Sequence, residues 1–274
     1  MILSDKEKQI YALDGVVKVS GAFDPKWVEF LRKATEENMN NPGEMAEEYA
    51  KAENSTRFFG DQYIWTRNND FRKFVFESEA AKIAAELMGS SKINMFFDHL
   101  LVKEPGSIEP TPWHQDGPYW KIKGEQICSI WFAMDNVSEE NGGVRYVKGS
   151  HRTGIRYRPQ SFSGKGHAEY GEAGLEVMPD IDQTVPEDQI VCYDLKPGDC
   201  LIHHANIIHG ARGNKSAKTR RRGYATRWTG DDVVWDPRKG TTDVLKDPGL
   251  KPGDPLDSDL FPVVWRNKSL NRKN

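Results

Sequence analysis

The chain has 274 residues, of which 37% are hydrophobic and 29% charged, and this length could form one large domain or two small ones. A net charge of −3 and an isoelectric point of about 6.2 indicate no basic surface, which argues against nucleic acid as a partner. No stretch approaches the roughly 18 consecutive apolar residues of a membrane span, and the first 15 residues carry charges where a secretory signal would be apolar.

Cysteine usage favours a reducing compartment. The three cysteines, Cys128, Cys192 and Cys200, are odd in number and show no C-x-x-C spacing, so we expect neither a disulfide framework nor a zinc–thiolate site. Each lies in an apolar stretch, where a small buried side chain is expected. The default expectation is a cytoplasmic protein.

Three helices are expected before residue 90. Residues 4–16 open with Ser4 as an N-cap and Glu7 three positions later, the pattern of a capping box. A short strand should follow the Asp14–Gly15 turn. Residues 25–38 place Trp27, Phe30, Leu31 and Ala34 on one helix face. Residues 78–88 form the strongest helical pattern, which ends at Gly89.

After residue 90 the pattern changes to short segments rich in β-branched and aromatic residues. Turn signals such as Pro105–Gly106 and Pro197–Gly198 separate these segments. Many short strands of this kind predict a barrel or a double-sheet jelly roll, an architecture that includes the cupins. We expect residues 231–274 to form an irregular tail packed on this core.

The region 151–187 contains few apolar residues and several glycines. A stretch this long without predicted structure is usually a lid, a binding loop or disordered. Both a lid and plain disorder stay open, and a buried metal site would favour the lid.

The segment His114-Gln115-Asp116 carries the chemistry. Side chains on a strand alternate, so His114 and Asp116 should face the same way. His209, which follows Asp116 by 93 residues, ends the apolar segment IHHANIIH just before Gly210. Two imidazoles and a carboxylate on one side of a metal form the 2-His-1-carboxylate triad, which suits iron(II) and leaves coordination positions open.

Two further histidines lie in the same segment. Alternation places His203 on the side of His209, and His204 on the other side with Asn206. Either could compete as a metal ligand, although a hydrogen-bonded structural histidine is the preferred interpretation of both. The short H-x-D pattern also occurs by chance, so His209 is needed to support it.

An arginine is expected near such a site. A 2-oxo acid chelated to iron would leave a distal carboxylate deep in the barrel, where an unpaired charge is very costly. Arginine offers a permanent charge and a two-pronged donor. Arg221 shares a strand face with the small residues Gly223 and Ala225, so we favour Arg221, with Arg220 as the close alternative.

Several motifs together resemble one known family. HQD, SIWFAMDNVSEENGGVRYVKGSH, PGDCLIHHANIIHGARGNKS and the following arginine resemble the phytanoyl-CoA dioxygenase family of iron(II)/2-oxoglutarate enzymes, as does the opening LSDKEKQIYALDGVVKVSGAFDPKWVEFLRKA. The resemblance implies a mainly β fold with flanking α-helices. Its double-stranded β-helix core would span residues 91–230 of a single domain, 1–274, with a helical part at 1–90 and the tail at 231–274.

The resemblance also implies the ligands. His114, Asp116 and His209 would hold iron(II), Arg221 or Arg220 would bind the 5-carboxylate of 2-oxoglutarate, and oxygen would be the second co-substrate. Asp116 argues for hydroxylation or desaturation, because related halogenases replace this carboxylate with a small residue.

The chain departs from the family pattern in three places. Ala211 replaces a frequent hydroxyl residue, which removes one co-substrate hydrogen bond, and Lys148 replaces a usual proline. One extra residue after Ser216 leaves the choice between the two arginines open.

The substrate is the least determined part. Phe96, Phe97, Trp113, Tyr119 and Trp120 cluster near the metal motif and are either core or substrate pocket, even an aromatic box for a quaternary ammonium group. Trp131 matches a tryptophan that family members often carry near the pocket. The candidate substrate-binding residues are therefore Trp113, Tyr119, Trp120 and Trp131.

Charged residues near the possible lid add a weaker indication. Arg145, Arg156 and Arg158 could receive an anion, although surface solvation is the preferred interpretation of each. We expect hydroxylation of an unactivated C–H bond in a small polar or charged metabolite, with succinate and carbon dioxide as co-products. The alternatives are another metal-dependent cupin-type enzyme and a non-catalytic module that binds 2-oxoglutarate. The sequence predicts no oligomeric state.

Overall fold

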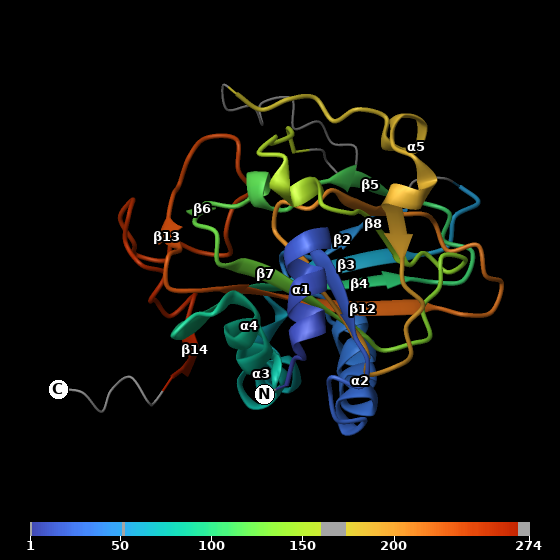
Figure 1. Ribbon diagram of the computed structural model, residues 1–274. Coiled ribbons are helices and arrows are strands. Elements are labelled where there is room, and N and C mark those ends of the chain that lie inside the picture. Colours follow the sequence, from blue (N-terminus) through green and yellow to red (C-terminus); the bar gives the residue numbers. More distant parts are fainter. Residues whose placement is uncertain (1, 51–52, 160–173, 268–274) are drawn as a thin grey trace.

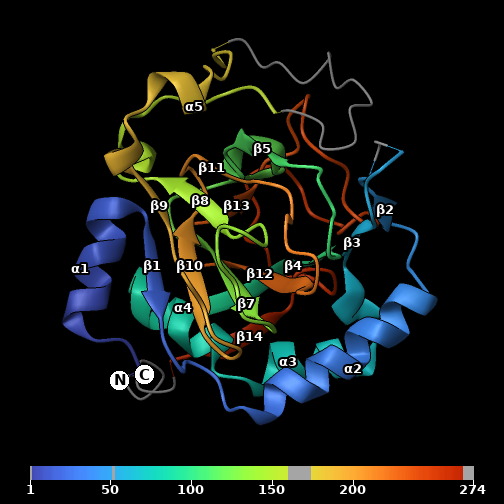
Figure 2. The same cartoon turned by 90° about the vertical axis from the view of Figure 1, so that its right-hand side faces the viewer.

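The computed structural model describes residues 2–50, 53–159 and 174–267, and their core is the expected jelly roll of two facing antiparallel sheets (Figures 1 and 2). The larger sheet has the order β1-β10-β7-β12-β4-β3-β2, with β14 paired to β4, and the smaller sheet has the order β5-β11-β8-β9. The strands of the larger sheet are β1 (Val16–Val19), β2 (Glu47–Glu48), β3 (Phe58–Gln62), β4 (Lys92–Lys103), β7 (Ile127–Ala133), β10 (Cys200–His204), β12 (Arg221–Thr229) and β14 (Val263–Arg266). Those of the smaller sheet are β5 (Thr111–His114), β8 (Val144–Val147), β9 (Ile190–Cys192) and β11 (His209–Ala211). A separate pair joins β6 (Ile122–Lys123) to β13 (Val234–Trp235).

Helices cover the outer face of the larger sheet (Figure 2). They are α2 (Lys26–Asn40), α3 (Asn69–Glu77) and α4 (Ala80–Met88), while α1 (Asp5–Asp14) packs beside β1 and the short α5 (Ile181–Thr184) lies on the side of the smaller sheet. Single 3₁₀ turns occur at η1 (Ile64–Thr66), η2 (Gly117–Tyr119), η3 (Ser150–Arg152) and η4 (Glu187–Gln189). Among the described residues, no helix combines the length and the apolar character that crossing a bilayer requires.

The helix boundaries follow the predicted signals. Ser4 and Glu7 form the capping box of α1, and Gly89 ends α4 in the left-handed conformation at φ 63°. Helix α3 was not predicted, although Phe71, Phe74 and Val75 show helical spacing and are buried against the sheet. The Asn68 side chain caps this helix by accepting from the backbone N–H groups of residues 70 and 71.

Alternation along the strands divides the larger sheet into two buried faces. On β7, Ile130 and Phe132 pack against the helices, whereas Trp131 and Ala133 face the space between the sheets. Apolar residues therefore occur at nearly every position of the central strands, because both faces are covered. The metal motif opens onto the space between the sheets.

Two predicted strands are shorter than expected. The segment IHHANIIH is not one strand, because β10 ends at His204, where the Ile207 N–H bonds the carbonyl of His204, and β11 begins at His209 in the opposite sheet. Likewise β5 ends at His114, and Asp116 has helical angles (φ −69°, ψ −45°) at the start of η2. The chain thus moves between sheets at both places.

The C-terminal region is more regular than the predicted tail. Val263–Arg266 forms β14 and extends the larger sheet beside β4, and Trp235, Leu256 and Phe261 pack with Phe96 in a second core cluster. Cys128 and Cys200 are buried and Cys192 is half-buried, all as free thiols.

Only part of the possible lid can be assessed. Within 151–187 the structure describes η3, a bridge between Tyr157 and Glu176, α5 and the start of η4. Residues 160–173 lie outside the described residues, so the lid stays a prediction.

Asp98 fixes the turn of η1 on the helix-covered outer face of β4. Its buried carboxylate accepts hydrogen bonds from the Ile64 and Trp65 N–H groups at 2.8 and 2.9 Å and from the Tyr224 hydroxyl at 2.6 Å. The Tyr63 N–H donates to the backbone carbonyl of Asp98 at 3.3 Å, and Tyr63 adopts the left-handed conformation at φ 54°. Burial raises the pKa of Asp98 to about 6, although these hydrogen bonds oppose the shift.

This raised pKa predicts a pH-dependent stability. Between about pH 4 and pH 6 the folded chain keeps a proton on Asp98 that the unfolded chain releases, so this contribution to the free energy of unfolding declines as pH rises. The difference in unfolding free energy between wild type and Asp98→Asn should fall by up to about 3 kcal/mol across that window. Urea denaturation at several pH values measures it, and a difference that is constant or increases with pH contradicts the assignment.

Candidate metal centre

His114, Asp116 and His209 meet between the two sheets. His114 is paired with His209 across β5 and β11, and their ring centroids lie 4.1 Å apart. One potential ligand atom from each of the three residues lies within 4.8 Å of the other two, and all three side chains are buried. Nε2 of His114 and Nε2 of His209 lie 3.6 and 3.9 Å from Oδ1 of Asp116.

Backbone carbonyls orient both imidazoles. Nδ1 of His114 donates to the Pro112 carbonyl at 2.8 Å, and Nδ1 of His209 donates to the Ile207 carbonyl at 3.1 Å. Because a carbonyl only accepts, each Nδ1 carries a proton, and Nε2 is the ring nitrogen that faces Asp116. Metal-binding histidines are commonly oriented in this way, by a hydrogen bond from the ring nitrogen that does not bind the metal.

A second set of contacts orients Asp116. Its Oδ2 accepts a hydrogen bond from the Ser129 hydroxyl at 3.3 Å and lies 3.5 Å from Nε2 of His203. His203 in turn pairs through Nδ1 with the Tyr146 hydroxyl at 3.2 Å. One carboxylate oxygen thus faces the two predicted ligands and the other is held by the larger sheet.

The protonation states suit a metal. Burial alone would raise the pKa of Asp116, but its contacts with His114 and His203 and the nearby His209 and Arg227 outweigh burial and hold the pKa well below its usual value. Burial, reinforced by His114, lowers the pKa of His209 well below its usual value. An ionised carboxylate beside the neutral imidazole of His209 suits a divalent metal.

The donor set fits iron(II). Two imidazole nitrogens and one carboxylate oxygen converge from one side. Two backbone carbonyls and the Ser129 hydroxyl hold all three side chains in place. A facial set of this kind leaves the opposite side of the metal to other ligands.

The structure separates the two candidate arginines. Arg221 is 1% exposed and lines the cavity with the metal motif, and its guanidinium carbon lies 5.6 Å from the centroid of the Trp131 ring. Its Nε has no hydrogen-bond partner among the described residues. Arg220 faces outward and forms ion pairs with Glu104 and Glu36. Arg221 is therefore the one placed to receive an anion.

A glycine makes room for this arrangement. A Cβ atom at Gly223 would lie 1.9 Å from the ring of Trp131, because the indole crosses β12 there. The small residue predicted on the face of Arg221 is thus required by close packing of Trp131.

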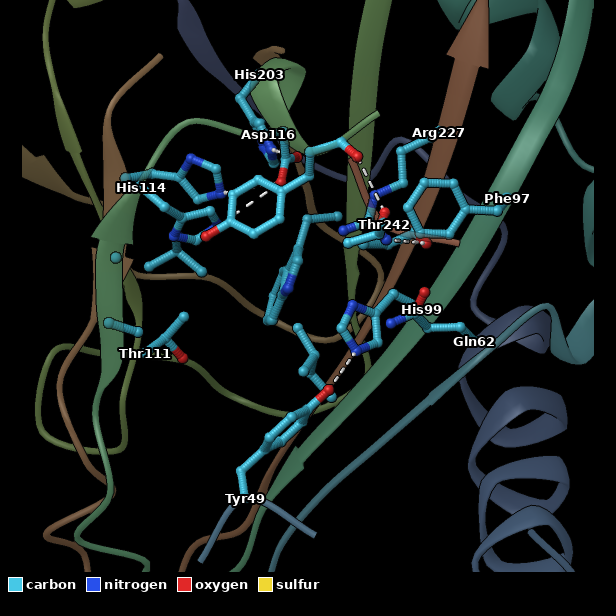
Figure 3. Close-up of a pocket in the computed structure, with 18 of the residues that line it drawn as sticks. Tyr49, Gln62, Phe97, His99, Thr111, His114, Asp116, His203, Arg227 and Thr242 are labelled. Carbon is cyan, nitrogen blue, oxygen red and sulfur yellow. Dashed lines mark hydrogen bonds and ion pairs between the residues drawn. The ribbon is translucent and has the colours of Figure 1, made fainter. Parts of the chain in front are cut away.

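Of the four predicted substrate-binding residues, three line the cavity and one does not. Tyr119, Trp120 and Trp131 line the cavity. Figure 3 labels other residues of the same cavity, among them His114 and Arg227. Trp113 does not line this cavity: it precedes His114 on β5 and so faces the other way, where it donates from Nε1 to Asp182 at 3.0 Å. We therefore withdraw Trp113 as a candidate. Phe97 lines the cavity, whereas Phe96 lies in the core behind it.

The three arginines that the sequence offered as anion-binding residues lie outside the metal cavity. Arg145 is buried in an ion-pair cluster with Asp182, Glu187 and Glu139, and it is not a solvated surface residue. Arg158 donates from Nε to the Leu175 carbonyl, and Arg156 lines a separate depression beside η2. None of the three lines the metal cavity.

Several cavity residues escaped the sequence analysis. The contact of His203 with Asp116 was missed, although alternation had placed it on the side of His209. His99 and Arg227 also line the cavity, on the same faces of β4 and β12 as Leu101 and Arg221. Their even spacing from these neighbours was the available signal.

Comparisons with known proteins agree with this geometry. Residues 11–223 match the family model described as phytanoyl-CoA dioxygenase. A probable phytanoyl-CoA dioxygenase of Caenorhabditis elegans is 26% identical over 157 residues, which cover 55% of this chain and 48% of that protein. The 1-deoxypentalenic acid 11-beta-hydroxylase of Streptomyces exfoliatus is 34% identical over 117 residues, 41% of this chain and 38% of that protein. The chain thus spans about half the length, or less, of these curated relatives.

Solved structures share the fold over nearly the whole chain. The non-heme alpha-ketoglutarate-dependent carbocyclase SnoK is 25% identical, with a TM-score of 0.75 over 96% of this chain and 97% of its own. The epimerase SnoN in complex with Fe³⁺, alpha-ketoglutarate and nogalamycin RO is 20% identical, with a TM-score of 0.74 over 95% and 98% of the two chains.

The contact between His203 and Asp116 predicts an effect on metal affinity. His203→Gln should weaken iron(II) binding by roughly 10- to 100-fold, as for other outer-shell partners of metal ligands. Calorimetry without oxygen measures this. His204→Gln is the matched control, since His204 faces the other way and accepts from the Asn206 N–H. Unchanged affinity in His203→Gln, or an equal loss in both variants, contradicts the assigned role.

Proposed function

Because the chain belongs to the phytanoyl-CoA dioxygenase family, we propose that it is an iron(II)- and 2-oxoglutarate-dependent oxygenase. The convergence of His114, Asp116 and His209, with both imidazoles oriented by backbone carbonyls, is the observation that carries this proposal. The family match runs from α1 to β12 and so supports one catalytic unit.

Each residue of the centre has a distinct task. His114, Asp116 and His209 would hold iron(II), which together with 2-oxoglutarate and oxygen supplies the oxidising chemistry for a C–H bond. Arg221 would receive the 5-carboxylate of 2-oxoglutarate through its free Nε edge, and the guanidinium lies over the ring of Trp131.

The surrounding residues keep the site ordered and largely dry. Ser129 and His203 hold Asp116 in one orientation, so that its Oδ1 faces the two imidazoles. Ala211 contributes no hydroxyl to the cavity, so Arg221 carries a larger share of the co-substrate binding than in relatives with a hydroxyl there. Apolar side chains such as Phe97, Leu101 and Val144 line much of the remaining wall.

We further propose that the reaction is hydroxylation of an unactivated C–H bond in a small polar or charged molecule, with succinate and carbon dioxide as co-products. The name of the Streptomyces relative, a hydroxylase, supports hydroxylation. The arginines in the cavity wall, Arg221 and Arg227, support a polar or charged substrate. Desaturation needs the same ligands, and mass analysis of the product distinguishes the two.

Loss of a metal ligand predicts loss of turnover. Asp116→Ala and His209→Ala should each abolish succinate formation from 2-oxoglutarate, because each removes one of the three protein donors of the facial set. The assay supplies ferrous iron, oxygen and a metabolite library. Asp243→Ala changes an exposed aspartate paired with Lys121 and should keep the wild-type rate. Wild-type rates in either ligand variant would contradict the proposal.

The two arginines predict opposite outcomes. Arg221→Gln should weaken 2-oxoglutarate binding to the iron-loaded protein at least about tenfold, since it removes a charge-assisted two-pronged contact. Arg220→Gln should leave this affinity unchanged, because Arg220 is engaged by Glu104 and Glu36 outside the cavity. Calorimetry compares them, and a reversed order would assign the co-substrate to Arg220.

A further inference from the structure

A second buried arginine lines the metal cavity without an ion pair. Arg227 lies on β12, is 7% exposed and points into the cavity beside Phe97 (Figure 3). No carboxylate among the described residues lies within 4.0 Å of its guanidinium, whereas Arg222 on the same strand pairs with Asp135 and Glu36. The carboxylates of Asp116 and Asp98 lie near enough to favour this charge, but neither forms an ion pair with it, and burial still lowers the pKa of Arg227. A buried cation without a close ion pair is unfavourable, so its retention calls for an explanation.

The edge of this guanidinium formed by Nε and Nη2 is free, and this is the edge through which arginine binds carboxylates. Nη1 donates to the Ala225 carbonyl at 3.3 Å, while Nε has no partner and no described residue accepts from Nη2. The guanidinium carbon lies 4.6 Å from the centroid of the Phe97 ring, which supports the group from one side. Nε and Nη2 together form a planar fork that matches the two oxygens of a carboxylate.

Arg227 and Arg221 define separate places in the cavity. They lie six residues apart on one strand, which corresponds to about 20 Å between their Cα atoms. Their guanidinium groups lie on different rings, that of Arg221 on Trp131 of β7 and that of Arg227 on Phe97 of β4. The 5-carboxylate of a 2-oxoglutarate held by Arg221 therefore does not occupy the fork of Arg227.

Arg227 is also close to the metal ligands. It is the register partner of Ser129 on β7, and the Ser129 hydroxyl donates to Asp116. An organic molecule anchored on Arg227 would thus lie beside the metal side of the cavity.

The neighbours of Arg227 form a recess with aromatic and neutral polar walls. Phe97 stacks on Tyr63 at 5.5 Å between centroids, and His99 pairs with the Tyr49 hydroxyl at 3.3 Å. Gln62 and Thr242 complete the labelled part of the wall in Figure 3. Glu47 also lines the cavity, but it is exposed and lies beyond ion-pair distance from the guanidinium.

We propose that Arg227 binds a carboxylate of the organic substrate, so that the substrate class is a carboxylic acid with an apolar or aromatic body. This inference rests on the proposed oxygenase function for the identity of the ligand as substrate. Phe97 and Trp120 offer the surface for the apolar body, and the Arg227 fork offers two charge-assisted hydrogen bonds for the acid group.

A structural role and a ligand-binding role for Arg227 predict different melting temperatures for a variant that lacks it. A structural arginine would lower the melting temperature when it is replaced. A ligand-binding arginine without a partner should leave the melting temperature of Arg227→Gln equal or higher, because the replacement removes an unpaired buried charge.

Benzoate and benzamide provide a matched pair of probes that differ in the charged group. We expect the wild-type protein, loaded with iron(II) and saturating 2-oxoglutarate without oxygen, to bind benzoate at least about tenfold more tightly than benzamide in calorimetry. Arg227→Gln should bind both alike. Arg227→Lys, which keeps the charge but loses the fork, should retain only part of the preference. Arg220→Gln, the same change just before β12 and outside the cavity, should keep all of it.

Four results would overturn the proposal. They are equal binding of the two probes by the wild type, a preserved benzoate preference in Arg227→Gln, a lowered melting temperature or failed folding of that variant, and tighter binding of phenyl phosphate than of benzoate. Failure of the oxygenase proposal is recognised separately, since it appears as absent 2-oxoglutarate binding or absent succinate release in the wild type. The probe titration needs no turnover.

Discussion

The buried carboxylate of Asp116 is the constraint on which the site depends. At 6% exposure it needs positive or hydrogen-bonding partners, and the fold supplies them from both sheets: His114 and His209 from the smaller one, Ser129 and His203 from the larger one. Because these partners come from four separate strands, the metal-binding geometry exists only when both sheets have formed and faced each other. The backbone contacts of the two imidazoles then fix which nitrogen each presents.

The inner face of the larger sheet adds two buried cations to this anionic centre. Arg221 and Arg227 share one face of β12, and the ring of Trp131 lies over Gly223 between them. A folded chain that held these charges for stability alone would pair them, as it pairs Arg222 and Arg220 on the outer face. The contrast along a single strand separates groups that hold the fold together from groups held ready for ligands.

The sequence predicted the jelly-roll core, the capping of α1 and the three residues that meet at the centre, because alternation and cap signals are local. It failed where the answer depends on pairing between distant strands. Asp116 reaches His114 through a turn and not along a strand, and His209 opens β11 because the chain changes sheets after His204. The contact of His203 with Asp116 exists only across the two sheets. Arg220 and Arg221 differ in burial because Glu104 and Glu36 draw the first outward, and neither partner adjoins it in sequence.

The central claim is that one metal ion is held by two imidazoles and one carboxylate between the sheets. Anomalous diffraction at the iron edge, from crystals grown without oxygen in ferrous iron, tests this most directly. The account predicts a single strong peak at about 2.0–2.2 Å from Nε2 of His114, Nε2 of His209 and a carboxylate oxygen of Asp116. A peak elsewhere, or one bound by His203 in place of either predicted histidine, would contradict it.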